Sequence, residues 1–278
     1  MSRANPISAL AIIRGSYAYV RVAIVPGLVG SVMFVLAAFL TDYVQAHQTF
    51  GGLSLLFSIA LFAGIGVVWS AMALRLGLGL KGDGFGLRLG RDELMLGASV
   101  MGFLFVLGIV TFLIGFLVFL LVMMIAAIGG GALTGADVAS APIFETPEAF
   151  RAFLAGTAQG QVIGVLGLAV LFSALLFLFW FIVRLLPFAA GAVRERRFVV
   201  LQAMSWTRYK DRALMGAGIA TLGVAAGVII ASRVLIGMMH LAGPIAIIAT
   251  HLVACMSLLV VVGFICQAYL HTGGAESG

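Results

Sequence analysis

The sequence predicts an all-α, polytopic membrane protein. We expect a bundle of about six transmembrane helices, with both termini in the cytoplasm and an amphipathic interfacial helix at the N-terminus. Hydrophobic residues make up 63% of the 278 residues and charged residues only 9%. The mean hydropathy is +1.22, and a soluble core of this size cannot bury so much apolar surface. The basic residues also cluster at the ends of long uncharged stretches, which is typical of transmembrane topology.

Residues 1–21 are predicted to form a helix on the cytoplasmic surface of the membrane. Asn5 and Pro6 are typical of a helix start, and Arg14 and Arg21 lie at the edge of an apolar stripe with helical spacing. The residues of this stripe are Ile7, Leu10, Ile13, Tyr17 and Val20. No convincing cleavage site follows, so we expect the first span to be retained. Pro26 and Gly27 are expected to break the chain between this helix and the first span.

Six spans are predicted within a single transmembrane domain of residues 22–270. The third is expected to be one long or tilted helix. Its uncharged run, Leu94 to Ala136, is too long for one perpendicular span and too short for two with a turn. A short outer interfacial helix is expected near Thr146–Glu148, and residues 271–278 are expected to form a flexible tail. The predicted spans are 22–40, 53–74, 95–128, 161–188, 213–236 and 245–269.

The distribution of arginine and lysine predicts the orientation. With both termini in the cytoplasm, Arg151 and Arg233 are the only basic residues of the sequence on the outer side, as the positive-inside rule requires. The net charge of +6 therefore indicates orientation, and no nucleic-acid partner is expected. Arginine outnumbers lysine, and both alanine and glycine are abundant. This composition indicates a bacterium with a GC-rich genome. The predicted location is the bacterial inner membrane.

No catalytic, cofactor or metal signature stands out. The glycines of residues 77–82 match the letters of a dinucleotide fingerprint, but they follow a transmembrane helix and lack the required strand. His251 and Cys255, one turn apart in the sixth span, are the weak intramembrane polar candidates. A metal site would need further ligands, so a histidine hydrogen-bonded to a neighbouring helix is the favoured interpretation. We expect no cofactor and, on balance, no enzymatic activity.

The basic segment Arg184–Arg212 connects the fourth and fifth spans. An arginine ends the span, Pro187 follows, and Arg194–Arg197 and Ala203–Thr207 come before Arg208. This order resembles an uncharacterised group of six-helix bacterial inner-membrane proteins, similar to the membrane domain of some glycerophosphodiester phosphodiesterases. The resemblance implies a six-helix membrane fold with a basic cytoplasmic segment. The catalytic phosphodiesterase domain has no counterpart in these residues, so its activity is not implied.

Six basic residues of this segment are the candidate contacts for anionic lipid headgroups or a membrane-protein partner. They are Arg194, Arg196, Arg197, Arg208, Lys210 and Arg212. On this basis we expect a non-enzymatic scaffold, accessory subunit or lipid-associated factor. The alternative is a small-solute or ion transporter or channel with a path between spans three to six. A third interpretation is that the basic residues serve only to orient the chain.

A sequence order recurs in the two cytoplasmic connections. Arg75 is followed by a basic loop and Asp92, and Arg184 is followed by a basic loop and Asp211. Internal duplication is one hypothesis for this recurrence, and chance similarity among common membrane residues is the other.

Overall fold

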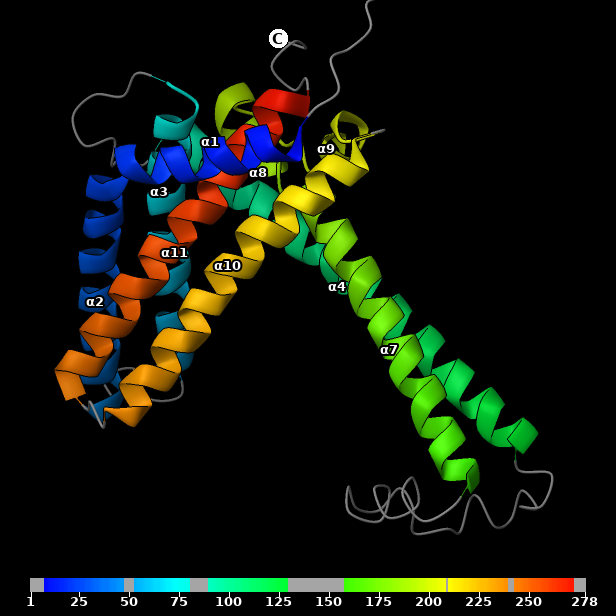
Figure 1. Ribbon diagram of the computed structural model, residues 1–278. Coiled ribbons are helices and arrows are strands. Elements are labelled where there is room, and N and C mark those ends of the chain that lie inside the picture. The colour runs from blue at the N-terminus through cyan, green and yellow to red at the C-terminus, as the bar shows by residue number, and fades with distance from the viewer. Residues whose placement is uncertain are drawn as a thin grey trace, which may run out of the picture. The chain divides into compact units, whose positions relative to one another are not determined.

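The computed structural model describes residues 8–47, 53–80, 90–129, 158–208, 210–239 and 243–272. In these residues the regular secondary structure is helical and includes no strand (Figure 1). The helices are α1 (Ala9–Val22), α2 (Ile24–Ala46), α3 (Ser54–Gly77), α4 (Arg91–Gly129), α7 (Ala158–Leu185), α8 (Phe188–Glu195), α9 (Gln202–Trp206), α10 (Asp211–Met238) and α11 (Gly243–Thr272).

Six helical stretches are long and apolar enough to cross a membrane. Helices satisfy all their backbone hydrogen bonds internally, and about 20 apolar residues cover the hydrocarbon core, so such stretches are stable in lipid. The chain is thus a multi-pass membrane protein, and the six predicted spans are confirmed as helices of the required length and composition. The stretches are Ile24–Ala46, Ser54–Gly77, Arg91–Leu120, Gly164–Glu195, Asp211–Met238 and Gly243–Thr272.

The helix breaks near Pro26 and Pro187 differ from the predicted ones. The break between α1 and α2 lies at Ala23 and not at Pro26. Pro26 belongs to the first turn of α2, where its missing N–H leaves no helical hydrogen bond unmade. The stretch that contains the predicted fourth span is interrupted, because α7 stops at Leu185 and α8 begins directly after Pro187 and continues to Glu195.

α4 confirms the single long helix predicted for the third span. It contains 39 residues, which corresponds to about 58 Å at 1.5 Å per residue. This length exceeds the hydrocarbon thickness of about 30 Å, so the helix is tilted or extends beyond the membrane. The outer helix predicted near Thr146–Glu148 lies outside the described residues.

The chain divides into two compact units. Unit 1 comprises Met1–Phe103 and Val183–Gly278, and unit 2 comprises Leu104–Ile182. In unit 1, α11 packs against α1, α2, α3, α8 and α10. α1 lies across the end of these long helices at which α8 and α9 also lie (Figure 1). In unit 2, α4 and α7 carry large exposed apolar side chains such as Phe112 and Phe172.

α1 is docked by a close approach and a hydrogen bond. A Cβ atom added to Gly263 of α11 would lie 2.6 Å from the carbonyl oxygen of Ser16, so only glycine permits this approach. The Tyr19 hydroxyl donates a hydrogen bond of 2.7 Å to the Ala73 carbonyl oxygen of α3. Burial raises the pKa of the Tyr19 phenol, which keeps this donor protonated. α1 is therefore joined to both α11 and α3.

The buried face of α1 is not the apolar stripe found in the sequence. Ile12, Ser16 and Tyr19 are the buried residues of α1. In the predicted stripe, Leu10 and Tyr17 are exposed and Ile13 and Val20 are half-buried, while Ile7 lies outside the described residues. The apolar stripe is therefore left largely without a protein partner.

A glycine substitution tests the docking of α1. In a helix, Gly→Ala normally stabilises by up to about 1 kcal/mol, but a methyl group on Gly263 meets the Ser16 backbone and forces α1 away, at a cost of about 1–3 kcal/mol. We expect Gly263→Ala to lower the midpoint of thermal unfolding in detergent. Gly227→Ala is the matched control, because a Cβ there has nothing within 4 Å. An unchanged or raised midpoint for Gly263→Ala contradicts the docking.

Candidate functional site

Two buried acids at the start of α4 hold an arginine from the end of α3. Arg75 Nε lies 3.4 Å from Asp92 Oδ2, and Arg75 Nη2 forms an ion pair with Glu93 Oε1. Glu93 Oε2 also accepts the Gly90 N–H at 2.8 Å. The three charged side chains are at most 5% exposed. A buried charge that loses its partner is strongly destabilising, so these residues fix the connection between α3 and α4.

Asp92 also binds an arginine from the second connection. Asp92 Oδ1 lies 2.9 Å from Arg196 Nε. Arg196 follows the last residue of α8 with a φ of 53°, a left-handed conformation that usually favours glycine. One member of the predicted contact set is therefore part of the network that links the two connections, although its side chain is 59% exposed.

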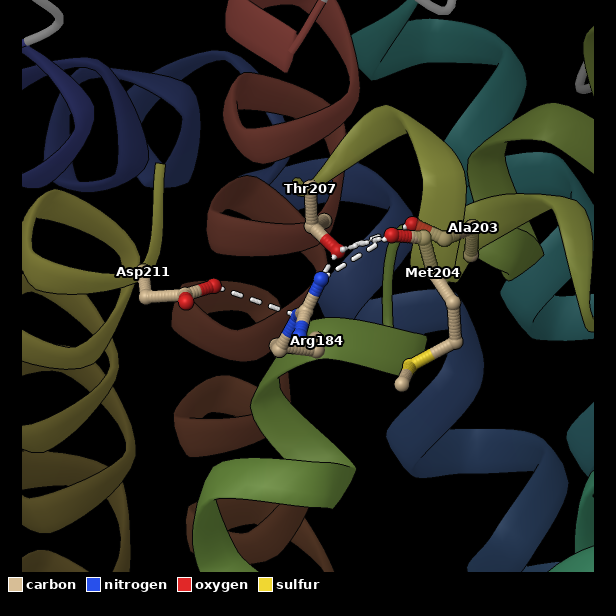
Figure 2. Close-up of polar contacts among 5 residues, drawn as sticks. All are labelled: Arg184, Ala203, Met204, Thr207 and Asp211. Carbon is tan, nitrogen blue, oxygen red and sulfur yellow. Dashed lines mark hydrogen bonds and ion pairs between the residues drawn. The ribbon is translucent and has the colours of Figure 1, made fainter. Parts of the chain in front are cut away.

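Arg184, at the end of α7, has acceptors on three successive parts of the chain (Figure 2). Its Nη2 donates to the Met204 carbonyl oxygen of α9 at 3.0 Å, and its Nε donates to Thr207 Oγ1 at 3.2 Å. Asp211 Oδ1, at the first residue of α10, lies 3.2 Å from the same Nε. Thr207 in turn donates to the Ala203 carbonyl oxygen at 2.9 Å. The Arg184 side chain is 11% exposed, and its guanidinium is held by protein groups instead of reaching toward solvent.

A third cluster surrounds Tyr269 near the end of α11. The Tyr269 hydroxyl donates to Glu195 Oε1 at 3.1 Å, and Glu195 also accepts from Arg197. The Trp206 ring packs edge-on against Tyr269 at 5.3 Å, and the Arg194 guanidinium lies 5.9 Å from the centre of the same ring. Aromatic and cation–π contacts thus attach α8 and α9 to α11.

The six predicted contact residues lie together at the charged end of unit 1 but differ in their roles. Arg194, Arg197, Arg208 and Arg212 are exposed. Lys210 is half-buried and donates to the His271 carbonyl oxygen at 3.2 Å, and Arg196 binds Asp92. Sequence reasoning missed the structural roles of Arg75, Asp92 and Glu93. The sequence signal for these roles was an arginine at the end of one span followed by acids at the start of the next span.

The intramembrane polar candidates, His251 and Cys255, have separate polar partners, and Cys255 is hydrogen-bonded to Ser31 of α2. His251 Nδ1 lies 2.8 Å from the Ile247 carbonyl oxygen of its own helix, and its ring stacks on Phe62 of α3 at 6.3 Å. The prediction that His251 bonds to a neighbouring helix was therefore wrong, because its Nδ1 partner lies on its own helix. Cys255 is buried and free. In the part of the chain that the structure describes, no group of three or more His, Cys, Asp or Glu residues could hold a metal ion.

Three hydroxyl groups in the spans bond to the carbonyl oxygen four residues earlier, as expected for isolated hydroxyls. Ser58 donates to Ser54 at 2.8 Å and Thr221 to Ala217 at 2.7 Å. Ser173 donates to the Ala169 carbonyl oxygen at 2.8 Å. These hydroxyl groups therefore donate their hydrogen bonds within their own helices.

The fold defines a multi-pass α-helical membrane protein whose ion pairs gather at one end of unit 1. Comparisons with protein-family models, curated proteins and solved structures find no match. Function is therefore inferred from the fold and from the side chains described above.

Removing Arg75 leaves the buried carboxylate of Glu93 without its cation and that of Asp92 with Arg196 alone. We expect Arg75→Gln to destabilise the protein by about 3–5 kcal/mol, measured as a large decrease in the thermal unfolding midpoint in detergent. Arg212→Gln, which removes an exposed charge, is the control and should change the midpoint little. Combining Arg75→Gln with Asp92→Asn and Glu93→Gln should recover much of the loss, because no buried charge is then left unpaired. A midpoint for Arg75→Gln equal to that of the control contradicts the role of the pair.

Proposed function

We propose that this chain is a non-enzymatic protein of the bacterial inner membrane that acts as a scaffold, accessory subunit or lipid-associated factor. Its contact surface is the basic cytoplasmic end of unit 1. The observation that carries the proposal is the division of the arginines there. The side chains of Arg75 and Arg184 are largely buried in ion pairs, whereas Arg194, Arg197, Arg208 and Arg212 are exposed, although Arg197 is also paired with Glu195. These last four residues are called the basic surface below.

Membrane electrostatics support a role for the basic surface in binding. The positive-inside rule places this end in the cytoplasm, where each arginine near an anionic leaflet contributes about 1 kcal/mol of attraction. The exposed apolar stripe of α1 at the same end supports its assignment as an interfacial amphipathic helix. A membrane-protein partner with an acidic surface is attracted by the same charges.

The segment Arg184–Arg212 carries the resemblance to the membrane domain of glycerophosphodiester phosphodiesterases, and its contacts support a structural role for the motif residues within it. Arg184 and Thr207, which both belong to this motif, are hydrogen-bonded to each other. Trp206 packs against Tyr269, and a Cβ on Gly191 would meet the Trp206 ring at 2.5 Å. The motif residues therefore hold the basic surface in place, and no chemistry follows from them.

The alternative function, a transporter or channel with a path between spans three to six, has less support. An ion path needs polar groups that face one another near mid-membrane. Ser58, Ser173, Thr221 and His251 instead bond within their own helices. The acids of the ion pairs named above, Asp92, Glu93, Glu195 and Asp211, lie at helix ends.

Cysteine labelling tests the orientation. In intact cells, a membrane-impermeant maleimide should label His47→Cys from the outside and should label Arg208→Cys only after the membrane is opened. Both native cysteines are buried, so the unsubstituted chain provides the background. The reverse labelling pattern contradicts the orientation and with it a cytoplasmic basic surface.

Neutralisation of the basic surface tests the contact. We expect the quadruple variant Arg194→Gln, Arg197→Gln, Arg208→Gln and Arg212→Gln to lose the lipid or protein that copurifies with the chain in mild detergent. The measurement is a pull-down read by lipid and protein mass spectrometry. Arg196 stays unchanged because it pairs with the buried carboxylate of Asp92, and Lys210 because it is half-buried and bonded to the end of α11. The thermal unfolding midpoint of the quadruple variant is measured as well, because Arg197 is paired with Glu195 and Arg194 lies against Tyr269.

Two controls separate binding from general charge. The same four positions changed to Lys retain the charge and should retain most of the copurifying material. Arg233→Gln removes an exposed arginine from the opposite end of α10 and should have no effect. If the quadruple Gln variant retains its partners at wild-type levels, the basic surface serves orientation alone.

A further inference from the structure

We propose that α1 binds the phosphate of an anionic phospholipid in a groove at the start of α2. The groove has a volume of about 580 Å³ and is formed mainly by α1, with Ile24 of α2 and Val260 of α11 completing it. A cavity of this size is in the range that takes small-molecule ligands. The proposal rests on the cytoplasmic, interfacial placement of α1 in the proposed function, but it uses none of the residues of the basic surface.

The polar side of the groove is cationic. Arg14, Arg21 and Tyr17 are lining residues, and the lining includes no acid. All three are exposed. Arg14 and Arg21 are seven residues apart, which places them on one face of α1 and about 10 Å apart along its axis. Two guanidinium groups at this spacing can converge on one phosphate and bind its oxygens by charge-assisted hydrogen bonds.

The opposite side of the groove is apolar and continues along the first span. Ile13, Ile24 and Val260 line it. Leu28, Val32 and Leu36 then follow Ile24 at four-residue spacing on α2, and all four α2 side chains are exposed. This row extends from the groove along a membrane-spanning helix, so it offers a surface for an acyl chain attached to a phosphate bound at Arg14 and Arg21.

Charge complementarity and this apolar continuation together favour a phospholipid over a free anion. A soluble phosphate ester would use the arginines but would leave the apolar side exposed to water. A zwitterionic lipid would bring its own cation next to the two guanidinium groups. The occupant that fits both sides is a phospholipid with net negative charge.

Lipid binding to the full chain tests the groove. The purified protein in an uncharged detergent is titrated with dioleoyl phosphatidylglycerol, and bound lipid is counted by native mass spectrometry. We expect Arg14→Gln with Arg21→Gln to weaken the tightest binding about tenfold or more, since two charge-assisted hydrogen-bond donors are lost. Dioleoyl phosphatidylcholine should bind the wild type more weakly and should be insensitive to the substitutions.

Three controls make the result specific. Arg91→Gln with Arg233→Gln removes the same charge from two exposed positions outside both the groove and the basic surface and should change this binding less than twofold; an equal loss in both double variants overturns the proposal. Ala18→Trp fills the groove from an exposed lining position and keeps both arginines, so it should also weaken lipid binding. Inorganic phosphate at the lipid concentration should displace no lipid. Full displacement, with binding intact in Ala18→Trp, identifies a free-anion site and overturns the lipid assignment.

The two proposals fail separately. If the quadruple variant loses its copurifying material and the substitutions at Arg14 and Arg21 leave phosphatidylglycerol binding unchanged, the basic surface is supported and the groove is contradicted. The opposite pattern contradicts the basic surface and supports the groove.

Discussion

The structure of unit 1 depends on charges that cannot be left unpaired at the ends of its membrane helices. Helices in lipid gain little from the hydrophobic effect when they associate, because lipid tails are as apolar as their side chains. A buried arginine must nevertheless meet an acid, so it fixes where the next helix begins. Arg75 meets Asp92 and Glu93, and Arg184 meets Asp211. Each arginine lies at the negative end of one helix dipole and each acid at the positive end of another, so the dipoles favour the same arrangement.

The same requirement explains the recurring order of the two connections without a common origin. A chain that leaves the membrane and returns beside itself places a helix C-terminus next to a helix N-terminus, and arginine followed by an acid suits both ends. Duplication therefore stays a hypothesis that the ion pairs do not strengthen. The two connections are also joined directly, because Asp92 binds Arg75 from one and Arg196 from the other. They form one charged cluster, in which displacement of either connection exposes the other's charges.

The sequence was sufficient for the six spans because lipid imposes a length and a composition that hydropathy measures directly. It was insufficient for contacts that depend on close approach. Ser16 is buried against Gly263 because both residues are small, whereas the apolar stripe of α1, with Leu10 and Tyr17, faces away from the protein. Apolar periodicity marks the buried face of a soluble helix, but at a membrane surface lipid competes for the same stripe. The partner of His251 was mispredicted for a related reason, since its own helix offered a carbonyl oxygen within reach.

The candidate surface shows why basic residues of one loop cannot be treated as equivalent. Arg196 is more than half exposed, yet its guanidinium completes the pairing of a buried carboxylate. Lys210 bonds to the end of α11. Substituting either residue disturbs the scaffold as well as the surface charge, so a loss of binding after neutralising all six positions would not separate folding from contact. Changing Arg194, Arg197, Arg208 and Arg212 leaves the buried pairs of Arg75 and Arg184 intact, although Arg197 is paired with Glu195 and Arg194 lies against Tyr269. The contact proposed for this end of the molecule therefore depends on the exposed four, and its shape on the buried pairs.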